Sequence, residues 1–144
     1  MEHRSALIVG AELTTADGYA ERATALEMLG RLPKTARRRT VAGDKAYDTK
    51  GFVAGVRELG FTPHVAANTK HSAIDARTTR HAGHQVSQRI RQTDRGTLRL
   101  TKTIGGGRQL RYRGRDRNRA WFKITAAVYN VIRITALDTQ PATT

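Results

Sequence analysis

An acidic residue at the end of a short apolar run is the first candidate for chemistry in this sequence. Asp44 follows Thr40–Gly43, and a stretch with helical character begins near Lys50. This order is typical of a strand, a loop and a crossover helix, and in open α/β sheets catalytic groups gather at the carboxyl ends of strands. A carboxylate at this position of a strongly basic chain is typical of a site where the carboxylate binds a metal ion and the metal ion acts on a polyanionic substrate. The alternative is that Asp44 only caps a turn or helix. Asp48 lies one turn further on and is a candidate either for such a cap or for a residue that supports Asp44.

Basic residues are the second candidate group. The stretch 68–119 holds fourteen basic and three acidic residues, so it carries +11 of the net charge of +14. Arginines interleaved with Tyr112 are typical of a surface that follows nucleic-acid phosphates, whereas a solvated basic segment without specificity is the alternative. The connector Lys34–Arg39 is either a phosphate contact or an exposed loop. The DNA-binding residues that we predict are Arg89, Arg91, Lys102, Arg108, Arg111, Arg113 and Arg115.

Alternating strands and helices are expected to position these groups. Apolar runs predict strands, and apolar residues three or four apart predict helices. The resulting order of strand, helix, strand, helix and strand predicts a parallel α/β unit. The expected elements are a strand at 6–13, a helix at 17–32, a strand at 40–43, a helix at 50–59 and a strand at 62–67.

The carboxyl-terminal part has the clearest helical pattern. Trp121, Ile124, Val128 and Val131 recur at helical spacing, so we expect an amphipathic helix over 120–137 that packs through this stripe, with Trp121 and Tyr129 as core anchors rather than base-stacking residues. The domain organisation that follows is a single domain over 1–137, with an α/β core at 6–67, a DNA-contacting region at 68–119 and this packing helix. A disordered tail is expected at 138–144.

Composition narrows the class of protein. The chain has 144 residues, enough for one domain, and 26 Lys and Arg against 12 Asp and Glu, which points to a polyanionic partner. The absence of cysteine excludes disulfides and thiolate metal sites. His81 and His84 lack a third ligand at a defined spacing, so they do not support a zinc site. No apolar run reaches membrane-spanning length, and we expect neither a membrane partner nor a small-molecule substrate.

Several ordered blocks resemble bacterial insertion-sequence transposases of the DDE superfamily, whose catalytic domain is ribonuclease-H-like. The blocks are VAGDKAYDT at 41–49, GFTPHVA at 60–66, VSQRIR at 86–91, KTIGG at 102–106 and AAVYNVIR at 126–133. The resemblance spans nearly the whole chain. It implies a mobile-element protein that takes part in DNA recombination.

In this superfamily three carboxylates hold two divalent cations, Mg²⁺ or Mn²⁺, for in-line phosphoryl transfer. The resemblance implies that Asp44 is the second acid of this triad and a metal ligand. The first acid lies on a strand that precedes the region matching Met1. We therefore expect this chain to be the carboxyl-terminal portion of a longer transposase, with an incomplete ribonuclease-H-like core.

The third acid has no clean match. Relatives carry a Glu at a position that corresponds to Arg95 or Gly96, and the nearest acid here is Asp94. Asp94 is a substitute one residue out of register, and such a shift turns a helical side chain by about 100°. We therefore expect the catalytic site to be broken.

The resulting hypothesis is a transposase-family chain that serves metal-dependent DNA cleavage and strand transfer, in a truncated and catalytically incomplete form. The alternative is a non-catalytic basic DNA-binding protein that modulates a full-length transposase through its DNA or its subunits. A basic RNA-binding protein is a weaker third hypothesis. We expect the protein to lie in the bacterial cytoplasm and to associate with the nucleoid by binding DNA.

Overall fold

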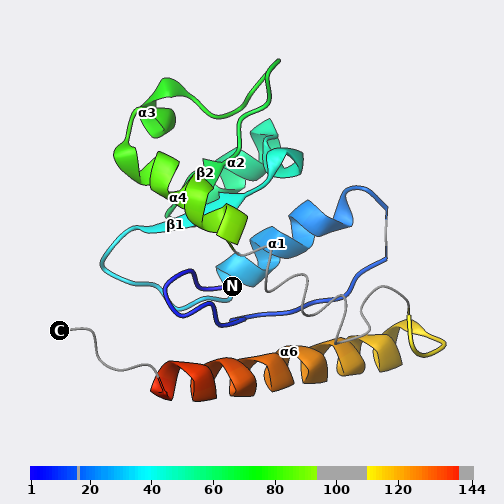
Figure 1. Cartoon of the computed structure of the whole chain (residues 1–144). Helices are drawn as coiled ribbons and strands as arrows, with labels where there is room; N and C mark the ends of the chain where they lie inside the picture. The colour runs from blue at the N-terminus through cyan, green and yellow to red at the C-terminus, as the bar shows by residue number, and fades with distance from the viewer. Residues whose placement is uncertain (16, 94–109, 140–144) are drawn as a thin grey trace. The chain divides into compact units, whose positions relative to one another are not determined.

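The computed structural model describes residues 1–15, 17–93 and 110–139 (Figure 1). The described chain forms two compact units, one of residues 17–93 and one of residues 1–15 with 110–139. We call them the sheet unit and the helix unit and treat each by itself. None of the helices in these residues is long and apolar enough to cross a membrane.

The sheet unit contains a two-stranded parallel sheet. Strand β1 (Arg39–Gly43) pairs with β2 (Phe61–Val65), with Arg39 opposite Phe61 and Gly43 opposite Val65. Helix α2 (Lys50–Glu58) makes the crossover between them. The other elements are α1 (Ala20–Gly30), the 3₁₀ helix η1 (Lys45–Tyr47), α3 (Ala76–Thr79) and α4 (Ala82–Thr93). A mixed α/β fold with parallel strands is therefore confirmed.

Local signals account for the limits of the crossover helix. The Thr49 hydroxyl caps α2 by accepting a hydrogen bond of 3.4 Å from the Phe52 N–H. Gly60 follows the helix with φ +81°, a left-handed conformation that favours glycine. The apolar face of α2 is then buried against Phe61 and Val65 of β2, and each such side chain contributes roughly 1.5–3 kcal/mol on full burial.

Different helices pack on the two faces of the sheet. Phe61 and Val65 belong to the apolar core that α2 and α1 share. His64 points to the other face, where its Nδ1 hydrogen bonds with Ser87 Oγ of α4 at 2.7 Å. The alternation of side chains along β2 thus gives one apolar layer and one layer with polar contacts.

The predicted strand at 6–13 is wrong. Among the described residues the sheet consists of β1 and β2, and residues 6–13 form no regular element. Asn130 of α6 (Arg115–Asp138) explains the difference. Its Oδ1 accepts from the Ile8 N–H at 2.8 Å and its Nδ2 donates to the Ile8 carbonyl at 2.9 Å. A side-chain amide here satisfies backbone groups that a neighbouring strand would otherwise pair.

The carboxyl-terminal helix and the burial of Tyr129 are confirmed, but the helix begins earlier than predicted and part of its packing face differs. The buried amide of Asn118 closes the preceding turn, since it accepts from the Tyr112 N–H at 3.0 Å and donates to the Gly114 carbonyl at 2.7 Å. Ala126 and Tyr129 are buried, and the Tyr129 hydroxyl donates to the Ala6 carbonyl at 3.1 Å. The predicted packing residues Ile124, Val128 and Val131 are exposed.

Candidate functional site

Asp44 lies directly after the last residue of β1. Its side chain is exposed, and its Oδ1 accepts a hydrogen bond of 2.9 Å from the Ala46 N–H, so it caps η1. The capping interpretation is confirmed, and the role as a metal ligand stays a prediction for this carboxylate at the carboxyl end of a parallel strand.

Helix α1 holds the turn that carries Asp44. The Tyr47 hydroxyl donates to Glu21 Oε1 at 2.7 Å, and Arg22 Nη1 donates to the Ala46 carbonyl at 3.2 Å. Burial raises the pKa of Tyr47, and the nearby carboxylates of Glu21 and Asp44 raise it further. The phenol therefore stays neutral at physiological pH and acts as a donor that fixes η1 against α1.

A buried carboxylate holds the other side of this turn. Asp48 is 4% exposed, and it accepts hydrogen bonds from the N–H groups of Asn68 at 2.6 Å and Ala73 at 2.8 Å. Burial alone would raise the pKa of Asp48, but these bonds and one from Ser72 outweigh it and hold the pKa below its ordinary value. Asn68 in turn donates from Nδ2 to the Lys45 carbonyl at 3.3 Å. Asp48 thus anchors the loop after β2 beside the Asp44 turn.

Two other carboxylates of the sheet unit have partners of their own. Asp75 accepts from Arg57 at 3.2 Å and from Arg77 at 3.0 Å. Asp17 accepts from the Ala20 N–H at the start of α1. In the part of the chain that the structure describes, no three metal-ligating side chains gather. Asp44 by itself therefore does not fit a two-cation centre, which needs several carboxylates.

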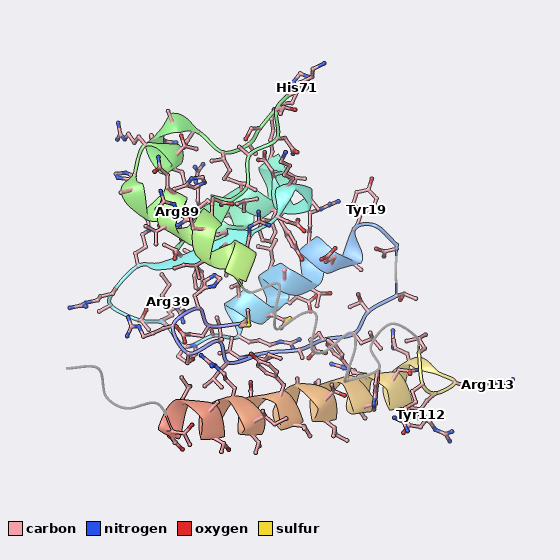
Figure 2. All side chains as sticks on the ribbon, viewed as in Figure 1. Tyr19, Arg39, His71, Arg89, Tyr112 and Arg113 are labelled. Carbon is pink, nitrogen blue, oxygen red and sulfur yellow. The ribbon has the colours of Figure 1, made fainter. Side chains whose placement is uncertain are left out.

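The predicted DNA-binding residues are distributed over both units. Arg89 and Arg91 lie on α4, where Arg89 is exposed and Arg91 is half-buried. Arg111 and Arg113 are exposed before α6, and Arg115 opens that helix. Figure 2 shows Arg89 on α4 and Tyr112 with Arg113 at the amino-terminal end of α6. The predicted residues Asp94, Lys102 and Arg108 lie outside the described residues.

Comparison with known protein families gives one match. Residues 1–104 match the family described as Transposase DDE domain. The chain belongs to this family. No curated protein and no solved structure matches it.

Membership in the transposase DDE family fits the placement of Asp44. The matched residues include α1, both strands and η1, and therefore the whole setting of this carboxylate. Transposases act on DNA, and DDE members generally use divalent metals. Sequence reasoning missed the residues that hold the Asp44 turn, Glu21, Arg22 and Asn68. No local signal reveals them, because their partners lie 20 or more residues away.

Proposed function

We propose that this transposase-family chain binds DNA and contributes Asp44 to metal-dependent DNA cleavage and strand transfer, but does not complete the catalytic site by itself. The observation that carries the proposal is the contrast between Asp44 and two other carboxylates of the sheet unit. Asp44 is exposed at the carboxyl end of β1 and accepts the Ala46 N–H through one oxygen, whereas Asp48 is buried on two backbone N–H groups and Asp75 pairs with two guanidinium groups. Further carboxylates must come from elsewhere for cations to be held there.

Charge supports DNA as the partner. The chain carries a net charge of +14, and exposed arginines occur in both units. Cationic side chains that neutralise phosphates release counterions, so affinity for DNA falls steeply as the salt concentration rises. We infer that Arg89, Arg91, Arg111, Arg113 and Arg115 supply such contacts, together with Lys102 and Arg108.

A non-catalytic role in modulating a complete transposase is the second candidate. The partnered state of Asp48 and Asp75 favours it, because neither carboxylate can join Asp44 without breaking its own hydrogen bonds. On this view the chain competes for DNA or joins a complete subunit.

Binding measurements test the proposal. Fluorescence anisotropy with labelled duplex DNA and RNA of the same sequence, at several salt concentrations, should give stronger binding to DNA and a steep salt dependence. The matched variant Asp44→Asn should bind DNA at least as well as the wild type, because it removes one negative charge. Equal or stronger binding to RNA would contradict the proposal.

Adding the chain to an active transposase of the family separates the two roles. A modulator should inhibit equally with Asp44 and with Asp44→Asn. A chain that contributes its carboxylate to a shared site should lose its effect in the variant.

A further inference from the structure

A basic cavity lies on the sheet unit at the end of the sheet opposite Asp44. It has a volume of about 490 Å³, and Arg38, Arg57, Arg77 and His81 line it with Thr40 and Thr62. None of the described residues that line it carries a carboxylate. Thr40 and Thr62 lie opposite each other near the starts of β1 and β2, whereas Asp44 follows the end of β1.

Two of the guanidinium groups are held in place by Asp75, which is not among the lining residues. Asp75 Oδ1 accepts from Arg57 Nη2 at 3.2 Å, and Asp75 Oδ2 accepts from Arg77 Nε and Nη2 at 3.1 and 3.0 Å. The Thr78 hydroxyl extends the network, since it donates to Asp75 at 3.3 Å and accepts from Arg57 at 3.4 Å. The two arginines are thus oriented before any ligand arrives, which lowers the entropy cost of binding.

A third guanidinium enters from the basic connector before β1. Arg38 is exposed and forms no hydrogen bond or ion pair within the described residues. Asp75 neutralises one of the three arginine charges, so a net charge of about +2 remains at the cavity before any contribution from His81. Guanidinium groups match phosphate oxygens with paired N–H donors, and threonine hydroxyls supply further donors.

We propose that this cavity binds a phosphate group of the DNA backbone. The inference rests on the proposed DNA-binding function and adds a specific contact in which Arg38 of the connector and Arg57 of α2 join Arg77 of the predicted basic region. A strand rises about 3.3 Å per residue, so the four residues from Thr40 to Asp44 separate the cavity from Asp44 by roughly 13 Å. That length corresponds to about four nucleotides of duplex rise. The cavity would hold the DNA strand at a fixed distance from the Asp44 carboxylate.

Two single variants and one matched control test this site. Arg38→Gln and Arg77→Gln remove exposed charges, and Arg31→Gln removes a similarly exposed arginine at the carboxyl-terminal cap of α1 in the same unit. We expect Arg38→Gln and Arg77→Gln each to weaken duplex binding on the order of tenfold. Each should also lower the salt slope by about one. Arg31→Gln should have less than about a twofold effect. Thermal melts verify that all three variants fold.

A second readout uses inorganic phosphate as the probe. Titration of phosphate into the isotope-labelled chain should shift the amide resonances of Thr62 and Thr78 in the wild type, and less in Arg77→Gln. Phosphate shifts without any effect of the variants on DNA binding would overturn the proposal in favour of a small phosphate compound.

The DNA-binding measurements distinguish an error in the cavity proposal from an error in the proposed function. If the wild type binds DNA and both cavity variants behave like Arg31→Gln, the cavity proposal is overturned and DNA binding stands. If the wild type does not bind DNA at all, the proposed function falls, and the assignment of the ligand falls with it.

Discussion

The carboxylate of Asp48 accepts a hydrogen bond of 2.6 Å from the backbone N–H of Asn68, 20 residues further along the chain. This bond joins the turn after β1 to the loop after β2, and the Asn68 side chain reaches back to the Lys45 carbonyl. Asp44 lies in the turn that is held in this way. The position of the exposed carboxylate therefore depends on a buried one.

Replacing the buried carboxylate should destabilise the sheet unit. Asp48→Asn places an amide NH₂ where one carboxylate oxygen now accepts a backbone N–H, so we expect a loss of about 2–3 kcal/mol in the free energy of unfolding. Urea unfolding measures it. The control Glu58→Gln changes an exposed acid at the end of α2 and should stay within about 0.5 kcal/mol of the wild type. Equal midpoints for the two variants would show that Asp48 does not anchor the loop.

The depressed pKa of Asp48 predicts a stability that falls in acid. A carboxyl group with a lowered pKa in the folded state stabilises the fold above its unfolded pKa of about 3.9, and this contribution disappears as the pH falls through the folded value. Urea midpoints between pH 7 and pH 3 should therefore decline below about pH 4. The decline should be shallower in Asp48→Asn. Identical pH profiles would contradict the assignment.

His64 should carry a second pH dependence, in a higher range. Burial lowers the pKa of His64, and the neighbouring charges of His84 and His81 lower it further. The unfolded chain then takes up a proton at a higher pH than the folded one, so stability should begin to fall as the pH drops below about 6.5. NMR titration of the His64 ring measures the pKa directly. A value at or above 6.5 would exclude this source of acid sensitivity.

Asn130 should hold the amino-terminal segment on α6. Its amide makes one hydrogen bond to each backbone group of Ile8, so Asn130→Ala should speed hydrogen exchange at the Ile8 amide. Asn130→Asp keeps the acceptor but loses the donor, and it should protect this amide to an intermediate extent. Unchanged exchange in Asn130→Ala would contradict the role of this side chain.

Local signals predicted the central part of the fold well. The apolar runs and the glycine at position 60 are enough to place β1, α2 and β2 within a residue or two. The turn position of Asp44 follows from the same signals. Its chemical role stays a prediction.

Long-range partners could not be predicted in the same way. An apolar run such as Ala6–Val9 indicates extended chain but not what pairs with it, and its partner here is a side chain 122 residues away. Helix α6 carries apolar residues on more than one face, so periodicity could not decide that Ala126 is buried while Ile124 and Val128 are exposed. The Arg57–Asp75–Arg77 cluster likewise requires α2 and α3 to be placed first.

On the proposed function, this chain binds DNA but does not cut it alone. The most direct test incubates the purified chain with supercoiled plasmid and Mn²⁺, with Asp44→Asn as the parallel sample. Native gels should show retarded DNA for both proteins, and the plasmid should remain supercoiled once protein is removed. Nicking by the wild type that Asp44→Asn abolishes would contradict the claim and would show that the chain holds a complete catalytic site.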